Sequence, residues 1–522
     1  MSAAVMALGD LVERASQRGL TCDVRGGSCE GVSVCGITND SRRVAQGDLF
    51  VAMAGTREDG GKYVEAALAA GAAAVVCTPA HARRDVVSIV VEDAHAAAGL
   101  LASSFYGDPS ESMDLVAITG TNGKTSCTYL MESVWKTSGC SPGVIGTIAQ
   151  RCAAFERTAE MTTPSAIDLQ RALADMAGAG CDCVALEASS HALDQRRIAG
   201  CRVRAGVFTN LTRDHLDYHQ TEESYFAAKA TLFRRHLQQG SAAVLNAEDG
   251  KVAGLAEELE KTRPDLDVWT YSAEPGARSR ARVLEADCTL EGIRARVELE
   301  GETITVRSPL VGAANLSNIM AVAAAAAALG IDAQVIGQGL SACPPVPGRM
   351  QRISARPPAV LVDYAHTPDA LDRSVRALLP ELSRNGDRGR LIVVFGCGGD
   401  RDRGKRPIMG GIAGKHADVA VLTSDNPRTE RPQDILAEIE AGIGTRLARQ
   451  PLEALAADGA SGYLVEADRR AAIEAAIALA KEQDVVLIAG KGHEDYQEVH
   501  GVKRHFDDRE VASAALQRRS SS

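Results

Sequence analysis

The chain has 522 residues, which is too long for one hydrophobic core and predicts several domains. Hydrophobic residues make up 45% and charged residues 24%, as in ordinary globular proteins. The net charge of −11 argues against nucleic acid as the main partner.

The N-terminal sequence and the cysteines indicate a cytoplasmic protein. The start, MSAAVMALGDLVERASQRGL, lacks a basic segment followed by an apolar one, so we expect no secretory signal. No uncharged apolar run approaches the ~18 residues of a membrane helix, so we expect no membrane insertion. The 13 cysteines are scattered, odd in number and without C-x-x-C spacing. They predict reduced thiols, with neither a disulfide framework nor a zinc site.

Alternation of strands and helices predicts three α/β domains with helix-covered parallel sheets, over residues 1–110, 111–343 and 344–522. In the first, a helix is expected at 8–18, Gly-punctuated strands at 31–54 and a strand at 74–77. In the second, strands are expected at 115–119, 183–187, 206–209 and 243–246, then a β-hairpin at 281–309 and an Ala-rich helix at 318–329. In the third, strands are expected at 360–364, 391–395, 419–423 and 485–489.

The second domain opens with VAITGTNGKTS, residues 116–126, a shortened form of a phosphate-binding loop. The usual pattern has four residues between its first Gly and the Gly-Lys-Ser/Thr end, whereas here only two residues lie between Gly120 and Gly123. The chemistry of such a loop is nevertheless complete. Glycines permit close approach, the helix N-terminus and Lys124 attract phosphate, and a hydroxyl can reach Mg²⁺. An ordinary glycine turn with a surface lysine is the alternative.

Two further groups follow neighbouring predicted strands. Glu187 ends the strand at 183–187, and His215 follows the strand at 206–209. Ligand groups collect at the carboxyl ends of parallel strands, and Mg²⁺ is the usual partner of ATP phosphates. Each residue alone could equally be a hydrogen-bonded loop residue. Lys229, on a predicted helix at 222–235, is by itself a solvated surface charge.

The order of these motifs resembles the Mur ligase family, ATP-dependent enzymes that build the peptide of peptidoglycan and whose phosphate loop is short. The resemblance implies Mg²⁺ as cofactor, with Thr125, Glu187, His215 and Lys229 as its ligands, Lys229 being carbamylated to N6-carboxylysine. Catalytic roles fall on Lys124, Glu187, His215, Lys229 and Arg349. The implied ATP-binding residues are Gly120, Thr121, Asn122, Gly123, Lys124, Thr125, Ser126, Asn315, Asn318, Arg349, Asp363 and His366. For the two asparagines, capping of a helix start is the alternative.

Residues 38–58 resemble the UDP-binding domain of the family members that add the third residue of the peptide. The resemblance implies a small N-terminal UDP-binding domain, a central P-loop-type ATPase domain and a C-terminal Rossmann-like domain. Met161 precedes the Thr-Thr pair that resembles a muramoyl contact. The implied contacts of the UDP-muramoyl substrate are Asn39, Ser41, Thr56, Arg57, Glu58, Thr162, Thr163, Ser189, Gln195 and Arg197.

The segment Asp425-Asn426-Pro427-Arg428 follows a predicted strand of the third domain. Asn-Pro favours a rigid turn, and the planar guanidinium of Arg428 suits a carboxylate. A plain β-turn is the alternative. Within the family framework the segment resembles the motif of members that add meso-diaminopimelate, so we expect a buried guanidinium that lysine would leave unpaired. The implied diaminopimelate site is Arg401, Asp425, Asn426, Pro427, Arg428, Gly490 and Glu494, with Glu494 on the distal ammonium.

The resemblance therefore implies an ATP-dependent ligase that adds meso-diaminopimelate to UDP-N-acetylmuramoyl-L-alanyl-D-glutamate through an acyl phosphate. Its partners would be these small molecules and ATP, and we expect a monomer. We also expect the third domain to close and bring Arg349 onto ATP. Three alternatives remain open: the same reaction with L-lysine, a folylpolyglutamate synthase, and a nucleotide-dependent regulatory switch, although the sequence has no Asn-Lys-x-Asp guanine motif.

Overall fold

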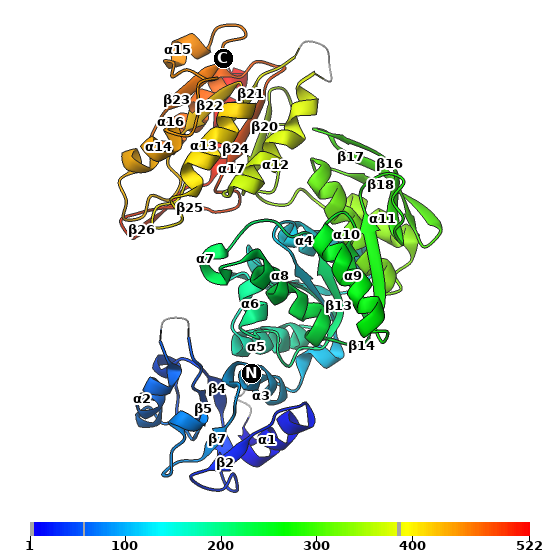
Figure 1. The fold of residues 1–522 in the computed structure, drawn as a ribbon, viewed down its shortest axis with the longest axis vertical. Helices are drawn as coiled ribbons and strands as arrows, with labels where there is room; N and C mark the ends of the chain where they lie inside the picture. Colours follow the sequence, from blue (N-terminus) through cyan, green and yellow to red (C-terminus); the bar gives the residue numbers. More distant parts are fainter. Residues whose placement is uncertain (1–4, 56–57, 384–387, 522) are drawn as a thin grey trace. The chain divides into compact units, whose positions relative to one another are not determined.

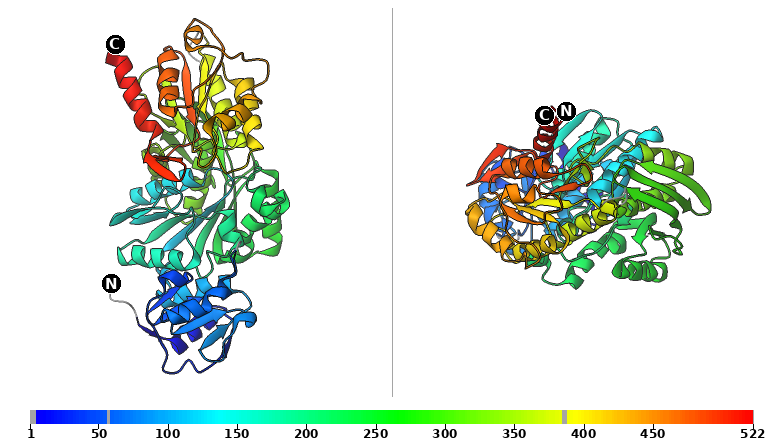
Figure 2. Two further views of the ribbon diagram at one scale, coloured as in Figure 1. Left: turned by 90° about the vertical axis from the view of Figure 1, so that its left-hand side faces the viewer. Right: turned by 90° about the horizontal axis from the view of Figure 1, so that it is seen from above.

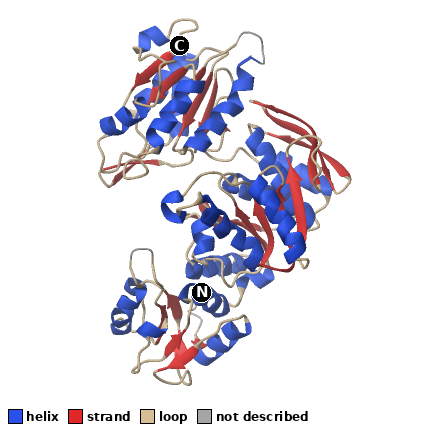
Figure 3. Cartoon of the chain, in the orientation of Figure 1, coloured by secondary structure: helices blue, strands red, loops and turns tan. Residues whose placement is uncertain are grey.

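The computed structural model describes residues 5–55, 58–383 and 388–521 of the chain (Figure 1). The chain divides into two compact units. The first comprises residues 1–211, 215–271 and 321–339, and the second comprises 212–214, 272–320 and 340–522. Helices flank strands in every part of the chain (Figure 3), which confirms the predicted α/β class. The predicted boundaries at 110 and 343 remain predictions.

The N-terminal part of the first unit is a small sheet in the order β2-β7-β6-β5-β4. Strands β4 to β7 are parallel and β2 is antiparallel to β7. Residues of β5, β6 and β7 are buried throughout, as expected for strands covered on both faces. The strands are β1 (Met6–Ala7), β2 (Asp23–Arg25), β3 (Ser33–Val34), β4 (Gly36–Thr38), β5 (Asp48–Val51), β6 (Ala74–Cys77) and β7 (Ser88–Val90). The helices are α1 (Leu8–Gln17), α2 (Val64–Ala69) and α3 (Ala94–Phe105), with short 3₁₀ turns η1 (Ser41–Arg43), η2 (Gly60–Tyr63), η3 (Pro79–His81) and η4 (Pro109–Ser112).

The larger sheet of the first unit has the order β11-β10-β9-β12-β8-β13-β14-β15. From β9 to β15 the neighbouring strands are parallel, with β8 between β12 and β13. The strands are β8 (Asp114–Thr119), β9 (Pro142–Ile145), β10 (Ala149–Cys152), β11 (Phe155–Thr158), β12 (Cys183–Glu187), β13 (Val203–Phe208), β14 (Leu237–Asn246) and β15 (Asp267–Ser272). The helices are α4 (Lys124–Thr137), α5 (Ala166–Gly178), α6 (Ser190–Asp194), α7 (Leu216–His219), α8 (Glu222–Thr231) and α9 (Gly250–Thr262), and a π-helical turn η5 (Leu232–His236) follows α8.

Residues 281–309 form a three-stranded antiparallel ribbon in the second unit, so the predicted hairpin was one strand short. Glu300 and Gly301 have φ of 48° and 93°, the left-handed pair that a tight hairpin turn requires. The strands are β16 (Ala281–Thr289), β17 (Gly292–Leu299) and β18 (Glu302–Ser308), and two helices follow, α10 (Ala313–Ala328) and α11 (Ala333–Ala342).

The C-terminal sheet of the second unit has the order β19-β20-β24-β21-β22-β23, in which only β19 is antiparallel to its neighbour. Apolar residues of α12, α13 and α14 pack on one face and those of α16 and α17 on the other, which makes a doubly wound fold. Figure 2 shows α17, in red, on the outside of this part. The strands are β19 (Gln351–Arg352), β20 (Ala359–Asp363), β21 (Leu391–Phe395), β22 (Val419–Leu422), β23 (Gly462–Val465) and β24 (Val485–Ala489), with a separate hairpin of β25 (Tyr496–Val499) and β26 (Val502–His505). The helices are α12 (Pro368–Leu378), α13 (Lys405–His416), α14 (Pro432–Glu440), α15 (Leu452–Leu455), α16 (Arg469–Leu479) and α17 (Asp508–Ser521), and a 3₁₀ turn η6 (Leu379–Ser383) follows α12.

Within the described part of the chain, no helix is both long enough and apolar enough to span a membrane.

Candidate active site

The phosphate loop joins β8 to α4 at the carboxyl edge of the first unit's parallel sheet. Gly120 has a φ of 142°, and a Cβ there would lie 1.9 Å from the Thr209 hydroxyl. The N–H of Thr121 donates to the Asn210 carbonyl at 2.9 Å, and the N–H of Asn122 donates to the Asn210 side-chain oxygen at 3.0 Å. The short loop is therefore an ordered turn fixed by the residues that follow β13.

The start of α4 presents the groups that a phosphate needs. Gly123 has a φ of 92° and immediately precedes the helix, so the N-terminal end of α4 and its helix dipole point to the loop. The Lys124 ammonium donates to the carbonyls of Gly120 and Thr121, each at 2.8 Å. Thr125 and Ser126 are buried in the first turn. The structure thus brings together all the loop residues expected to bind ATP.

Glu187 and Lys229 both lie at this edge of the sheet. In the register of β12 and β8, Glu187 pairs with Ile118, two residues before Gly120. Its side chain is 1% exposed and accepts hydrogen bonds from the N–H and the hydroxyl of Thr147 at 2.9 and 3.0 Å. Lys229 is also 1% exposed, and its ammonium donates to the Gly120 carbonyl at 2.8 Å. The alternative of a solvated surface lysine is therefore wrong.

His215 belongs to a cluster of aromatic side chains that the spacing of the sequence does not reveal. It has a left-handed φ of 52°, and its ring lies 4.9 Å from that of His191 and 6.1 Å from that of Tyr225. Burial and the neighbouring His215, His219 and Arg197 lower the pKa of His191 to about 4. His191 is therefore neutral at physiological pH, beside the expected metal ligand.

A cavity of about 360 Å³ in the first unit gathers several of the residues expected to bind the UDP-muramoyl substrate. Four of them line it, namely Asn39, Glu58, Gln195 and Arg197. Ser41 begins the turn η1 and does not line the described part of this cavity. Thr56 and Arg57 lie outside the described residues.

Arg197 connects this cavity to the strand end that carries Glu187, an expected metal ligand. Its guanidinium donates to the Gln195 side chain at 2.7 and 3.1 Å and to the Thr163 carbonyl at 2.8 Å, and it lies 3.4 Å from the Met161 sulfur. The Thr163 hydroxyl in turn donates to the Glu187 carbonyl at 2.7 Å. The Ser189 N–H donates to the Thr163 hydroxyl at 3.1 Å, and the Thr162 hydroxyl lies 3.1 Å from that of Thr147. A continuous polar path therefore runs from the cavity to the strand end that carries Glu187.

The second unit carries the remaining residues expected to bind ATP. Arg349 lies over the ring of Tyr364, with 4.5 Å between its guanidinium carbon and the ring centre. Burial raises the pKa of Tyr364 to about 12. The Asp363 carboxylate accepts from the Met350 N–H at 2.9 Å, and His366 Nδ1 lies 2.9 Å from the Tyr364 carbonyl. Arg349, Asp363 and His366 therefore gather around Tyr364.

Gly348, just before Arg349, has a φ of 61°. A Cβ at this position would lie 2.1 Å from backbone atoms of Gly492 and His493. The two segments therefore touch through their main chains, which only glycine permits.

Asn315 and Asn318 are buried inside α10, which begins at Ala313, earlier than predicted. The Asn318 side chain donates to that of Asn315 at 3.1 Å, and Asn315 donates to the Val311 carbonyl at 2.9 Å. Neither residue precedes the first turn, so capping of the helix start does not explain them.

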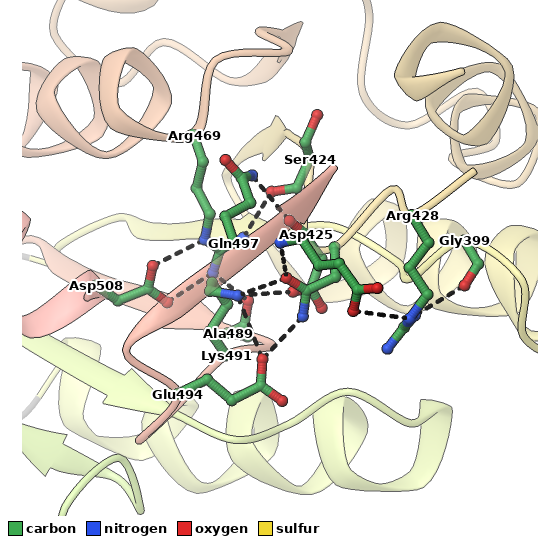
Figure 4. A network of polar contacts seen from close by, with 12 residues as sticks. Gly399, Ser424, Asp425, Arg428, Arg469, Ala489, Lys491, Glu494, Gln497 and Asp508 are labelled. Atoms are coloured by element: carbon green, nitrogen blue, oxygen red, sulfur yellow. Dashed lines mark hydrogen bonds and ion pairs between the residues drawn. The ribbon is translucent and has the colours of Figure 1, made fainter. Parts of the chain in front are cut away.

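The residues expected to bind diaminopimelate meet at the carboxyl ends of β21, β22 and β24. Arg428 donates to the Gly399 carbonyl at 2.8 Å, and its Nε lies 3.7 Å from the Glu498 carboxylate (Figure 4). The Asn426 amide donates to the Glu494 carboxylate at 2.9 Å. The Arg428 side chain is 21% exposed and has these protein partners, so it is partly buried, and whether lysine would leave it unpaired stays a prediction.

Two glycines complete this arrangement. A Cβ on Gly398 would lie 2.8 Å from Arg428 Nη1 and 3.8 Å from Arg401 Cγ, so both arginines flank that glycine. Gly490 has a φ of 120°, and a Cβ there would lie 3.3 Å from an Asp425 oxygen. The loops after β21, β22 and β24 thus bring arginine and carboxylate side chains to one end of the sheet.

Comparisons with known proteins support a single assignment. Three family models match: the Mur ligase family catalytic domain over residues 33–106, the Mur ligase middle domain over 118–326, and the Mur ligase glutamate ligase domain over 348–492. A UDP-N-acetylmuramoyl-L-alanyl-D-glutamate–2,6-diaminopimelate ligase from Gloeobacter violaceus is 45% identical over 494 residues, 94% of this chain and 95% of that protein. The chain belongs to the Mur ligase family.

Other relatives of this Mur ligase agree. A ligase of the same description from Synechococcus elongatus is 43% identical over 94% of this chain and 95% of its own length. A solved structure of a UDP-N-acetylmuramoyl-L-alanyl-D-glutamate–2,6-diaminopimelate ligase is 34% identical, with a TM-score of 0.67, over 94% of this chain and 96% of that one. MurF ligase from Thermotoga maritima in complex with ADP shares the fold at 19% identity, with a TM-score of 0.59, over 92% and 98% of the two chains.

The structure of this Mur ligase adds residues that the sequence did not single out. Lys491 and Arg469 are fully buried beside the expected diaminopimelate site, and Figure 4 shows both within its polar network. Lys491 lies in the sequence between Gly490 and Glu494, two residues that were expected to bind diaminopimelate. Nothing in the Ala-rich sequence of α16 marks Arg469 as part of the site.

One cluster of side chains with metal-ligand atoms was not singled out from the sequence. Among the described residues, Cys140, Asp182 and Cys183 place one such atom each within 4.8 Å of one another, with Asp182 exposed, and the expectation of no zinc site stays a prediction. Cys140 comes from a different segment, so sequence spacing did not reveal the group.

Proposed function

We propose that this Mur ligase uses ATP to join meso-2,6-diaminopimelate to UDP-N-acetylmuramoyl-L-alanyl-D-glutamate. The observation that carries the proposal is the polar network after β21, β22 and β24, in which Arg428 donates to the Gly399 carbonyl and Asn426, two residues before Arg428, donates to the Glu494 carboxylate. The distal head of diaminopimelate carries one carboxylate and one ammonium. Relatives at 43–45% identity bear the name of this activity.

The UDP-muramoyl substrate binds in the cavity lined by Asn39, Glu58, Gln195 and Arg197. The path from Arg197 through Thr163 to Glu187 directs the D-glutamyl end to the phosphate loop. An oxygen of its free side-chain carboxylate attacks the γ-phosphorus of ATP, the bond to ADP breaks, and an acyl phosphate forms. The amine of diaminopimelate then attacks the acyl carbon, phosphate leaves with the bonding electrons, and the amine loses a proton.

Lys124 and the N–H groups of the loop stabilise the charge on the phosphoryl oxygens. In the structure the Lys124 ammonium rests on the carbonyls of Gly120 and Thr121, within the turn that would surround a phosphate. We propose that Arg349 approaches the same phosphates from the second unit when the C-terminal domain closes, which excludes water from the acyl phosphate.

The donor groups near the loop fit Mg²⁺, which prefers oxygen ligands. The Glu187 carboxylate accepts two hydrogen bonds from Thr147, and its oxygens have further lone pairs for a metal ion. Thr125, Glu187, His215 and Lys229 would hold the ion, Lys229 after carbamylation to an anion. When bound, Mg²⁺ neutralises charge on the ATP phosphates.

In the amino-acid pocket, Arg428 and Arg401 would bind the distal carboxylate of diaminopimelate, and Glu494 the distal ammonium. Lysine has the ammonium alone and leaves Arg428 with its protein partners only. We place the reaction in the cytoplasm, where ATP and a UDP-linked precursor are available, and propose that the enzyme acts as a monomer.

The test is phosphate release from ATP with the UDP-muramoyl dipeptide and either meso-diaminopimelate or L-lysine. Wild type should require diaminopimelate, and Arg428→Ala should lose roughly 10- to 100-fold in kcat/KM for it, the value of one charge-assisted contact. Arg431→Ala, which removes an exposed arginine three residues further along, is the matched control and should behave as wild type. Equal use of lysine would refute the pocket assignment, and release independent of any amino acid would indicate a nucleotide switch instead.

A further inference from the structure

Lys491 is a fully buried ammonium in the wall of the proposed amino-acid pocket. Its Nζ donates to the Asn426 side-chain oxygen at 3.1 Å and to the Glu494 carboxylate at 3.3 Å, and lies 3.6 Å from Asp425 Oδ1 (Figure 4). Among the described residues, that Asp425 oxygen has no hydrogen-bond partner, so the ion pair with Lys491 is its compensation. A buried charge persists only where it is paired in this way.

Lys491 offsets the negative charge of two carboxylates. Its ammonium lies 3.3 Å from a Glu494 oxygen and 3.6 Å from an Asp425 oxygen, and the side chain is fully buried. Carboxylates that are offset in this way suit a head group that carries one ammonium and one carboxylate. Without Lys491 the same carboxylates favour a head group that carries an ammonium alone.

Lys491 also limits how Glu494 can bind a ligand. One oxygen of Glu494, Oε2, accepts from both the Asn426 amide and Lys491. That oxygen is therefore engaged by protein donors, and the other oxygen remains for a substrate ammonium. The ammonium of Lys491 thus weakens the attraction of Glu494 for other cations. It also leaves the second carboxylate oxygen of Glu494 as the one that faces a substrate ammonium.

We propose that Lys491 determines the amino-acid specificity of this enzyme by making the pocket require a carboxylate beside the ammonium. The inference rests on the proposed function, because it concerns the choice between diaminopimelate and lysine at that site. It adds a residue to the pocket and assigns it a role in rejecting lysine, separate from the direct contact of Arg428.

A second buried cation, Arg469, supports the main chain of the loops that begin at Asp425 and Gly490, and its contacts do not involve Lys491. Arg469 donates to the carbonyls of Ser424 and Ala489, at 3.3 and 3.0 Å, and forms two hydrogen bonds with the Asp508 carboxylate at 2.8 and 2.7 Å. These contacts hold the main chain just before Asp425 and just before Gly490. Substitution of Lys491 therefore removes charge from the pocket while the main-chain support of both loops remains.

The experiment compares kcat/KM for meso-diaminopimelate with that for L-lysine in wild type and variants, at saturating ATP and UDP-muramoyl dipeptide. Lys491→Met keeps the length of the side chain and removes its charge. We expect the ratio of diaminopimelate to lysine use to fall about 10- to 100-fold, the scale of one charged contact, while the KM for ATP stays constant. Asp425→Asn changes the charge in the opposite sense, so its ratio should rise, and this variant tests the idea even if Lys491→Met does not fold.

Asp508→Asn is the control variant, since it weakens the support that Arg469 gives to both loops and leaves the contacts of Lys491 with Asp425, Asn426 and Glu494 in place. It should lower the use of both amino acids together and leave their ratio unchanged. Equal losses for both amino acids in Lys491→Met, or an unchanged ratio in both charge variants, would overturn the assignment of Lys491 alone. Wild-type turnover with neither amino acid would overturn the proposed function and this inference with it.

Discussion

Replacement of Gly120 by alanine tests whether the shortened loop is the phosphate site. The added Cβ would lie 1.9 Å from the Thr209 hydroxyl and 3.1 Å from the Asn210 N–H. Thr209 donates to the Asn122 carbonyl at 2.5 Å, and Asn210 accepts from the N–H groups of Thr121 and Asn122. The side chain therefore pushes against the two residues that shape the loop.

The magnitude follows from two terms. Alanine at a φ of 142° costs about 1–3 kcal/mol of backbone strain, and displacement of the Thr209 hydroxyl costs about 0.5–1.5 kcal/mol for its hydrogen bond. The unfolding free energy of the first unit should therefore fall by about 1.5–4.5 kcal/mol. Displaced loop N–H groups should weaken ATP binding by roughly 10- to 100-fold, since each 1.4 kcal/mol is a factor of ten.

Gly139→Ala provides the matched control at the other end of α4. Gly139 also has a positive φ, of 86°, but a Cβ there meets no atom within 4 Å. It should cost about 1–2 kcal/mol of stability and leave ATP affinity unchanged. Titration calorimetry with a non-hydrolysable ATP analogue and thermal unfolding give both quantities. Wild-type ATP affinity in Gly120→Ala would refute the reasoning, and equal loss of affinity in both variants would trace the effect to general instability.

Three further predictions concern stability. Burial lowers the pKa of His236 to about 4, below its value of ~6.5 in the unfolded chain. The contribution of neutral His236 to the unfolding free energy is therefore full above pH 6.5 and is lost as the pH falls towards 4. Unfolding midpoints measured between pH 6.5 and 4 should decline less in His236→Gln than in wild type. Thr163→Val removes the buried 2.7 Å hydrogen bond to the Glu187 carbonyl and should destabilise the first unit by about 1–3 kcal/mol in thermal unfolding, whereas an unchanged midpoint would contradict this. Asp484→Asn breaks the buried ion pair with Arg390, 2.9 Å long, and should cost about 3–5 kcal/mol by denaturant titration, a cost below 1 kcal/mol being evidence against the argument.

Much of the fold was predictable because the buried strands are short apolar runs bounded by polar or glycine residues. The strands at 74–77, 183–187, 391–395 and 485–489 have the predicted bounds, and all their residues are buried. At 281–309, apolar and polar residues alternate, which indicated strands but did not give their number. The turn at Glu300–Gly301 between the second and third strands was not recognised, because it lacks a distinctive turn sequence. The start of α10 was placed late, because Ala313 and Ala314 carry no capping side chain.

The site was predictable where chemistry is concentrated in consecutive residues, as in the phosphate loop and the segment 425–428. It was not predictable where a role depends on contacts between distant segments. Arg469 reaches Ser424 and Ala489 across the fold, and Thr209 fixes a loop almost ninety residues earlier. The burial of Lys229 likewise follows from how α8 packs near the phosphate loop, which the helical period of the sequence alone does not show.

The main chain at Gly348 packs directly against that of Gly492 and His493, so two segments proposed to bind different co-substrates are in backbone contact. Arg349, proposed for the nucleotide, follows the first segment, and Glu494, proposed for the amino acid, follows the second. Because backbone meets backbone there, neither segment can shift towards the other without a collision. We therefore expect that a ligand which orders one segment also restricts the other, so that binding of the two co-substrates would be linked through a residue that has no side chain.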